Sequence, residues 1–444
     1  MGSRLTPMHA SDLPHDLQRR SLAAVWHPCT QMARAAQVPP LAVARGDGPW
    51  LIDTAGRRYF DAISSWWVNL FGHSDPGLIA AIEAQLRTLP HVMLAGCTHE
   101  PAVRLAERLA ARTGGALGHA SFASDGASAV EIALKQSFHS WRNRGRTAKQ
   151  RFACLRHSYH GETIGALAVT DVAVFRDAYD PLLRHALIID APDSRTGDET
   201  AALAALRETL ERHHHELAAL IVEPLVQGAA GMVMHSPDYL RAARALCRAH
   251  DVHLIADEIA VGCGRTGRFF AWEHTEPAGP ADWPDFVLLS KGITGGTLPL
   301  SLVLTTDAVF QAFWSDDTAR GFLHSHSYTG NPLACAAANA VLDRFDAGQL
   351  AANARQAAWL AEAFAPLGRD PRVAHLRQRG TILAFDVPAA PAGFAERFHL
   401  AGRARELLIR PIGRSVYVMP PYLIDAARAD WLAAAVRDAL HDVV

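Results

Sequence analysis

The stretches VHLIADEI (residues 252–259) and DFVLLSKGITGG (residues 285–296) decide the fold. Each opens with a short apolar run that predicts a buried β-strand, and each run ends at a charged residue, Asp257 or Lys291. Similar runs are ALIIDAP (186–192) and LAALIVEPL (217–225), and helical patterns between or beside them are AVEIALKQSFHSWR (129–142) and LRAARALCRAH (240–250). This alternation predicts an α/β fold with a mostly parallel sheet.

The two ends of the chain have different patterns from the middle. Residues 41–63 indicate hairpins around a DTAG turn, and long Ala-rich helices beyond residue 345 precede the strand-like TILAFDV (381–387) and SVYVMPP (415–421). We therefore expect a large domain over residues 64–344. The two terminal segments, 1–63 and 345–444, should join into a smaller α/β domain.

Composition excludes several classes of protein. The formal net charge of −2 over 444 residues gives no basic surface for nucleic acid. No apolar run reaches the roughly 18 residues of a membrane span, and the first residues lack the apolar core of a secretory signal. The six cysteines are scattered without a C-x-x-C pair, which is typical of a reducing cytoplasm.

Only three of the 43 basic residues are lysines. Chemistry that needs a deprotonatable amine cannot use arginine, so any catalytic lysine is one of these three. Lys135 lies in an amphipathic helical pattern and Lys149 in the basic segment RNRGRTAKQR, and we expect both to be solvated. Lys291 instead ends a buried strand, at the sheet edge where ligands of α/β folds bind, and could form a Schiff base with an aldehyde.

Asp257 is the natural companion of Lys291. A carboxylate at the end of an apolar strand is costly unless it is paired, and a protonated pyridine nitrogen is a suitable partner. The two residues are 291 − 257 = 34 positions apart, about one strand-to-strand connection with an insertion. They could therefore face one cofactor from adjacent strands.

Two further motifs could complete a cofactor site. In FASDGASAVEIALK (122–135), free N–H groups at Gly126, Ala127 and Ser128 would form a phosphate site at a helix N-terminus. The alternative is a plain helix cap made by Ser124 or Asp125. In HSYHGETIGAL (157–167), Tyr159 is suited to stacking on a flat ring.

Other interpretations of the sequence motifs have less support. Gly262, Gly264 and Gly267 form a G-x-G-x-x-G pattern, but no clear amphipathic helix follows it, as a dinucleotide site requires. The histidines at 213–215, 324 and 326 lack convincing further ligands, so we expect no metal. A regulator that binds a cofactor without turnover stays open as a non-enzymatic alternative.

Four motifs together resemble the class III aminotransferases, over about residues 25–425. They are SYHGETIGAL (158–167), DEIAVGCGRTGRFFAWEH (257–274), LSKGITGGTLPLS (289–301) and SYTGNPLACAAA (327–338). The resemblance implies the aspartate-aminotransferase fold (fold type I), pyridoxal 5′-phosphate as cofactor, and a homodimer whose subunits share their active sites.

The same resemblance implies roles for individual residues. Lys291 would be the Schiff-base lysine, Asp257 would contact the pyridine nitrogen, and Tyr159 would lie on the ring face. The backbone at Gly126 and Ala127 would bind the phosphate, with Ser327 added from the second subunit.

Within the class, three more motifs resemble the members that aminate 8-amino-7-oxononanoate in biotin biosynthesis, usually with S-adenosylmethionine as donor. They are WHPCTQM (26–32), DAISSWW (61–67) and RPIGRSVYVMPPY (410–422). The implied substrate contacts are an apolar wall (Trp66, Trp67), a carboxylate clamp (Arg410), and two shaping residues (Tyr417, Gly330). Cys29 departs from the usual tyrosine, and Glu162 stands where aspartate is also common.

The sequence indicates the identity of the amino donor less directly. The motifs around Cys29 and Trp66 show no acid to receive the second ammonium of lysine, whereas tryptophans can stack on an adenine and a sulfonium. We therefore expect S-adenosylmethionine. Lysine as donor, or an ω-amino acid or diamine transaminase, are the alternatives within the class.

Overall fold

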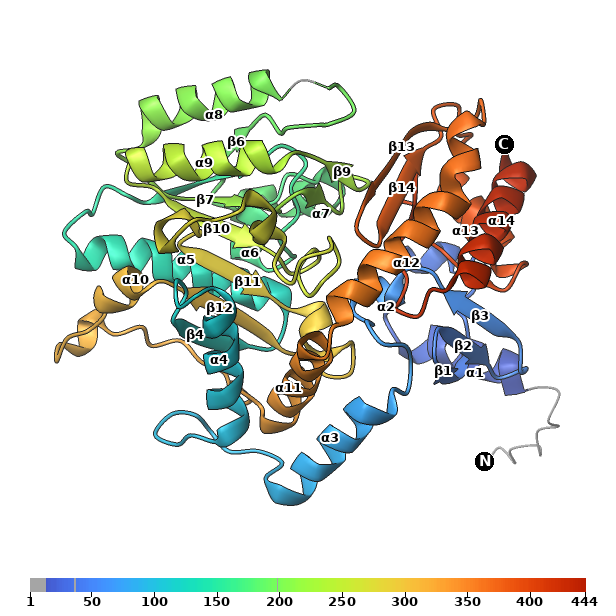
Figure 1. Cartoon of the computed structure of the whole chain (residues 1–444), viewed down its shortest axis with the longest axis horizontal. Coiled ribbons are helices and arrows are strands. Elements are labelled where there is room, and N and C mark those ends of the chain that lie inside the picture. Colours follow the sequence, from blue (N-terminus) through green and yellow to red (C-terminus); the bar gives the residue numbers. More distant parts are fainter. Residues whose placement is uncertain (1–12, 36, 198) are drawn as a thin grey trace, which may run out of the picture.

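A seven-stranded sheet forms the centre of the molecule (Figure 1). The computed structural model describes residues 13–35, 37–197 and 199–444. In spatial order the strands are β4 (His119–Ala123), β12 (Ser301–Thr305), β11 (Phe286–Leu289), β10 (His253–Asp257), β7 (Leu217–Val222), β5 (Arg151–Leu155) and β6 (Leu187–Ile189). Of the seven strands, β12 alone runs against the common direction, which confirms the predicted mostly parallel sheet.

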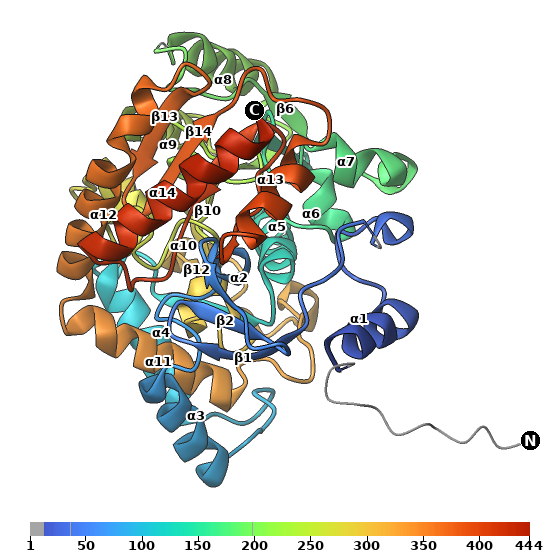
Figure 2. The same cartoon turned by 90° about the vertical axis from the view of Figure 1, so that its right-hand side faces the viewer.

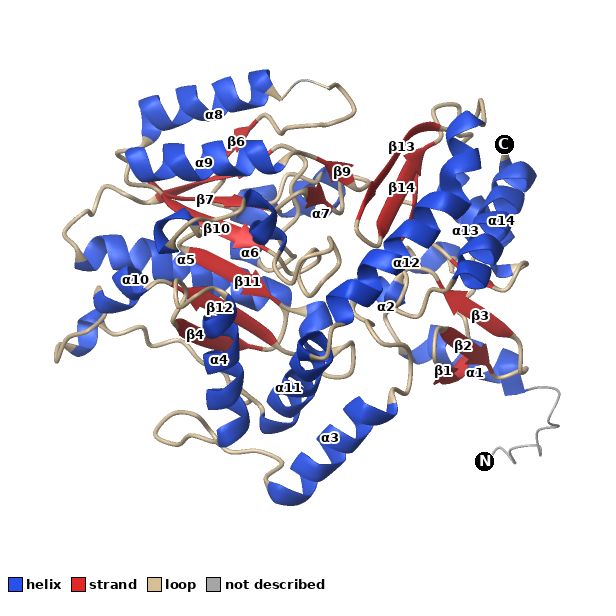
Figure 3. Ribbon diagram, viewed as in Figure 1, coloured by secondary structure: helices blue, strands red, loops and turns tan. Residues whose placement is uncertain are grey.

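Helices cover both faces of this sheet (Figure 3). One face carries α5 (Gly126–Asn143), and the other carries α8 (Thr200–His213) and α9 (Pro237–Ala249). Along β7, Ala219 and Ile221 pack into the cluster under α5, while Leu220 and Val222 join the cluster under α9. Because both faces are buried, the strand reads as a continuous apolar run instead of an alternating one.

Shorter helices and a small hairpin surround the sheet and connect its strands. They are α3 (Pro76–Thr88), α4 (Glu100–Arg112), α6 (Ile164–Ala168), α7 (Ala173–Arg176), α10 (Asp307–Gln311) and α11 (Pro332–Asp346), with β8 (Val226–Gln227) pairing β9 (Val233–Met234). None of the helices in the described ranges has the length and apolar run that crossing a membrane requires.

Two smaller sheets lie to one side, and they bring the two ends of the chain together. The first contains β1 (Val43–Asp47), β2 (Trp50–Asp53), β3 (Arg58–Asp61) and β15 (Leu407–Leu408); the second contains β13 (Ala374–Arg379), β14 (Ile382–Asp386) and β16 (Ser415–Val418). The parallel pairing of β15 with β3 joins segments almost 350 residues apart. The expected domain boundaries after residues 63 and 344 stay a prediction, and the second falls inside α11.

Helices pack around these small sheets on the side shown in Figure 2. They are α12 (Gln349–Phe364), α13 (Phe394–Arg403) and α14 (Ala426–Val443). The N-terminal α1 (Leu13–Ala24) lies at the periphery, and the four-residue turn α2 (Ser64–Trp67) leads from the small sheets toward the large one.

Lys149 is not in an exposed loop, so this expectation is wrong. The residue is only 1% exposed, and its ammonium donates to the backbone carbonyls of His214, Leu217 and Asp251. Burial lowers its pKa to about 8, while the three carbonyls and the Trp141 ring, 4.7 Å away, stabilise the charged form. Composition alone could not distinguish this lysine from a solvated one.

Replacing Lys149 by methionine should lower the free energy of unfolding by about 2–4 kcal/mol, because three carbonyls lose a charged donor. Chemical denaturation measures this loss. The matched control is Lys135→Met, since Lys135 is exposed and should change stability by less than about 0.5 kcal/mol. Equal losses in both variants would contradict a structural role for Lys149.

Candidate active site

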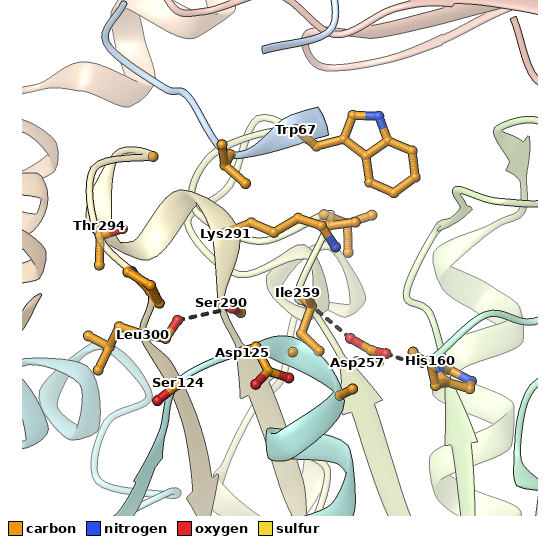
Figure 4. Close-up of a pocket in the computed structure, with 18 of the residues that line it drawn as sticks. Trp67, Ser124, Asp125, His160, Asp257, Ile259, Ser290, Lys291, Thr294 and Leu300 are labelled. Atoms are coloured by element: carbon orange, nitrogen blue, oxygen red, sulfur yellow. Dashed lines mark hydrogen bonds and ion pairs between the residues drawn. The ribbon is translucent and has the colours of Figure 1, made fainter. Parts of the chain in front are cut away.

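A cavity of about 580 Å³ opens where β10 and β11 end, beside the N-terminus of α5 (Figure 4). Its lining includes Lys291, Asp257, Tyr159, Glu223 and Trp67. The parallel pairing of β10 with β11 places the ends of these strands side by side. The structure therefore brings the two residues singled out at the strand ends into one cavity.

Lys291 begins a short 3₁₀ turn (Lys291–Thr294) directly after β11, and its φ of 47° lies in the left-handed region. The glycines that follow this turn fit tightly against residues 68–70: a Cβ at Gly296 would lie 2.8 Å from the Cα of Asn69. Burial lowers the pKa of the Lys291 ammonium, and the anions of Asp257 and Glu223 oppose that shift. A lowered pKa favours the neutral, nucleophilic amine.

Asp257 faces the cavity with its carboxylate held from behind. Its Oδ2 lies 2.7 Å from Nδ1 of His160, and its Oδ1 accepts the N–H of Ile259 at 3.1 Å (Figure 4). His160 is not among the predicted site residues, although it stands next to Tyr159 in the same motif. Nothing in a spacing of 97 residues indicates that the two side chains meet.

The N-terminus of α5 borders the same cavity. Helix geometry leaves the N–H groups of Gly126 and Ala127 without intrahelical acceptors, so they remain available to an anion. Ser128 differs, because the Asp125 side chain accepts from both its N–H and its hydroxyl. The helix cap that we considered as an alternative is thus present, and it removes Ser128 from the expected set of free donors.

Tyr159 lines the cavity and is fixed at both ends. Its hydroxyl donates to Oε1 of Glu162 at 2.8 Å, and its backbone N–H donates to Glu223 at 3.1 Å. Burial and the bond to Glu162 raise the pKa of the phenol, which therefore stays neutral. Glu162 also lies 3.8 Å from Sγ of Cys29, where burial and this carboxylate raise the thiol pKa.

Trp67 reaches the cavity through a left-handed turn. Residues 64–67 have φ values of 50°, 47°, 70° and 75°, which cost about 1–2 kcal/mol per residue outside glycine. Asp61 stabilises the turn by accepting from the N–H and the hydroxyl of Ser65. As a result the Trp67 ring lies over Lys291, with Nζ 5.2 Å from its centroid.

The other expected substrate residues lie around this turn, outside the lining of the cavity. Tyr417 is buried behind Trp67 and accepts its indole N–H at 3.0 Å; burial raises its pKa to about 12. Trp66 is 46% exposed, and the Arg410 guanidinium lies 5.7 Å from its ring. Trp66 and Arg410 therefore form a separate pair near the surface.

Ser327 and Gly330 do not line the cavity of this chain either. Ser327 is exposed, and the carbonyl of the buried Gly330 accepts from His99 at 2.8 Å. Their segment nevertheless borders the site, because His326 lies 3.1 Å from the hydroxyl of Ser124, a lining residue. Among the described residues no cluster of three or more His, Cys, Asp or Glu side chains could hold a metal ion.

Comparison with known proteins gives consistent matches. The family model for aminotransferase class III matches residues 31–440. The adenosylmethionine-8-amino-7-oxononanoate aminotransferase of Helicobacter pylori is 40% identical over 420 residues, covering 92% of this chain and 94% of that protein. The corresponding Geobacter sulfurreducens protein is 35% identical, covering 94% and 96%.

Solved structures agree with the sequence matches. The crystal structure of adenosylmethionine-8-amino-7-oxononanoate aminotransferase from Methanocaldococcus jannaschii is 31% identical, with a TM-score of 0.91 and coverage of 97% of this chain and 99% of that one. A PLP-bound amine transaminase from an uncultivated Pseudomonas species is 32% identical, with a TM-score of 0.88 and coverage of 95% and 99%. These neighbours confirm the predicted fold class.

Proposed function

Because this chain belongs to the class III aminotransferases, we propose that it transfers an amino group from S-adenosyl-L-methionine to 8-amino-7-oxononanoate. The product is 7,8-diaminononanoate, an intermediate of biotin biosynthesis. The observation that carries the proposal is the meeting of Lys291 and Asp257 in one cavity at the ends of β10 and β11.

The residues of the cavity suit pyridoxal 5′-phosphate. Asp257 offers a carboxylate for the pyridinium nitrogen, Tyr159 a flat ring, and the N–H groups of Gly126 and Ala127 a place for the phosphate. When bound, the cofactor supplies an aldehyde that receives amino groups and a ring that stabilises a carbanion at the substrate carbon.

The chain contributes binding and proton transfer. The ε-amine of Lys291 is suited to take the proton from the α-carbon of the donor and to deliver a proton to C7 of the keto acid. Its lowered pKa leaves a neutral amine for this task. His160 keeps the Asp257 carboxylate oriented, and Trp67 covers Lys291 and limits access of water.

Lys291→Ala should bind pyridoxal phosphate but lose at least roughly 10³-fold in turnover, because nucleophile and proton carrier are both removed. Borohydride reduction of the loaded wild-type enzyme, followed by peptide mapping, should tag Lys291. Lys135→Ala is the matched control and should keep its activity. Tagging of Lys135 or Lys149, or near-normal turnover of Lys291→Ala, would contradict the assignment.

Arg410 is the proposed clamp for the distal carboxylate of the keto acid. Within the described part of the chain it stacks on Trp66 and forms no ion pair with a carboxylate, so its charge is available to a ligand. Trp66 and Trp67 would line the path of the alkyl chain, and Tyr417 supports Trp67 from behind. The proposed role of Gly330 in substrate binding rests on the family resemblance alone.

Arg410→Ala should raise KM for 8-amino-7-oxononanoate about 10²-fold, from losing a bidentate charged pair of roughly 2–3 kcal/mol. The half-reaction with the donor should change less. Steady-state kinetics and single half-reactions separate the two. Arg414→Ala, which removes an exposed guanidinium four residues away, is the matched control. Equal damage to both half-reactions would instead indicate a structural role for Arg410.

One premise of the donor prediction is wrong. The sequence suggested that no acid lies near Cys29, but Glu162 lines the cavity beside it. A carboxylate there could receive the ammonium of lysine, and equally a cationic group of S-adenosylmethionine. The relatives named for adenosylmethionine, together with the two tryptophans, favour S-adenosylmethionine as donor.

The donor is tested by mixing the yellow, cofactor-loaded enzyme with one candidate at a time and following the visible absorption. S-adenosylmethionine should bleach the yellow band rapidly and lysine should not. Cys29→Tyr should change KM for S-adenosylmethionine by less than about tenfold, since one added aromatic contact contributes roughly 0.5–1 kcal/mol. Fast bleaching by lysine alone would overturn the donor and leave the aminotransferase assignment intact.

A second candidate within the class is an amine or ω-amino acid transaminase. It is favoured by the similarity to amine and ω-transaminases of 31–32% identity. A screen of keto acids and amines with the loaded enzyme distinguishes the two functions. The same screen excludes a cofactor-binding regulator as soon as any turnover is seen.

The working enzyme would be a homodimer with shared sites in the cytoplasm. Ser327 and Tyr328 are exposed, so a neighbouring subunit could contact them. Their segment borders the cavity through His326, which would bring that neighbour close to the site. All six cysteines are free thiols, as is usual in a reducing compartment.

A further inference from the structure

Glu223 is a buried acid that follows β7 and lines the cavity. Each of its two oxygens accepts a backbone N–H from a different segment. Oε2 accepts from Tyr159 at 3.1 Å, and Oε1 accepts from Gly228 at 3.0 Å. One carboxylate thus ties the loop after β5 to the turn after β8.

The turn at Gly228 also touches Trp67. A Cβ at position 228 would lie 2.9 Å from Cη2 of Trp67, so glycine is the residue that lets the turn approach the indole. Trp67 in turn lies over Lys291, and Tyr159 lines the same cavity. The contacts of one carboxylate therefore position both aromatic side chains beside the reactive amine.

Glu223 also places a negative charge near the Lys291 ammonium. The ionisable groups that face it are Asp257, His160 and Lys291. Burial raises the pKa of Glu223 to about 7, and its anion opposes the fall of the Lys291 pKa. A negative charge on Glu223 therefore stabilises a cation on the Lys291 nitrogen.

We propose that Glu223 is a positioning residue, which fixes Tyr159 and the Gly228–Trp67 contact while its charge tunes the Lys291 nitrogen. This inference rests on the proposed function. It assigns Glu223 no contact with the reacting atoms; the two oxygens act through the backbone N–H groups that they accept.

The chain offers a matched control in Glu258. This acid is also buried, and it also accepts two backbone N–H groups, from Ala271 and Trp272. Burial raises its pKa to about 8. It is absent from the lining of the cavity, so its loss removes a similar buried anchor without disturbing the two aromatic side chains.

The experiment compares Glu223→Gln, Glu223→Asp and Glu258→Gln as enzymes loaded with pyridoxal phosphate. Absorbance against pH reports the protonation of the nitrogen that Lys291 shares with the cofactor. Glu223→Gln removes the anion, so the midpoint should fall by about 0.5–1 pH unit. Glu223→Asp keeps the charge but is too short for both N–H groups, so the midpoint should stay while KM for 8-amino-7-oxononanoate rises about tenfold.

Glu258→Gln should lower thermal stability like the Glu223 variants but shift the midpoint by less than half as much. If Glu223→Gln titrates like wild type, or if Glu258→Gln reproduces both effects, the inference is overturned while the proposed function stands. A wild-type protein that never turns yellow with pyridoxal phosphate would overturn both. Should Glu223→Gln fail to fold, Glu223→Asp alone decides: an unchanged KM refutes the positioning role.

Discussion

The parallel pairing of β10 with β11 is the constraint on which the rest of the site depends. Its register sets Asp257 opposite Leu288, three residues before Lys291, so a carboxylate and an amine leave the sheet at neighbouring points. Both groups then stand in a partly desolvated space where an unpaired charge is costly. His160 pairs with the Asp257 carboxylate and orients it. Burial lowers the pKa of Lys291, which favours its neutral amine over an unpaired charge.

Strained backbone gathers around this pair. Lys291 has a positive φ, and the four residues of α2 follow one another in the left-handed region. Such conformations persist only where other contacts hold them. Here Asp61 binds the turn on one side, and the buried guanidinium of Arg265 donates to the carbonyls of Trp67, Asn69 and Pro420 on the other. These contacts hold the four left-handed residues in the segment that places the indole over the amine.

Three acids line the cavity, and each is held by a different kind of partner. Asp257 is oriented by a histidine, Glu223 by two backbone N–H groups, and Glu162 by the phenol of Tyr159. All three line the cavity, so a cation bound there could be met by more than one carboxylate. The amines and the sulfonium of the proposed substrates are cations of this kind.

The sequence predicts the strands, the fold class and the choice of Lys291, because apolar runs are properties of short segments and the scarcity of lysines is a property of its composition. It could not determine that Lys149 is buried, that Asp125 engages Ser128, or that Glu162 lies beside Cys29. It also missed His160 and Glu223 as partners of Asp257 and Tyr159. Periodicity reports whether a residue faces the interior, but which distant segments meet there is decided only when the sheet and its loops pack together.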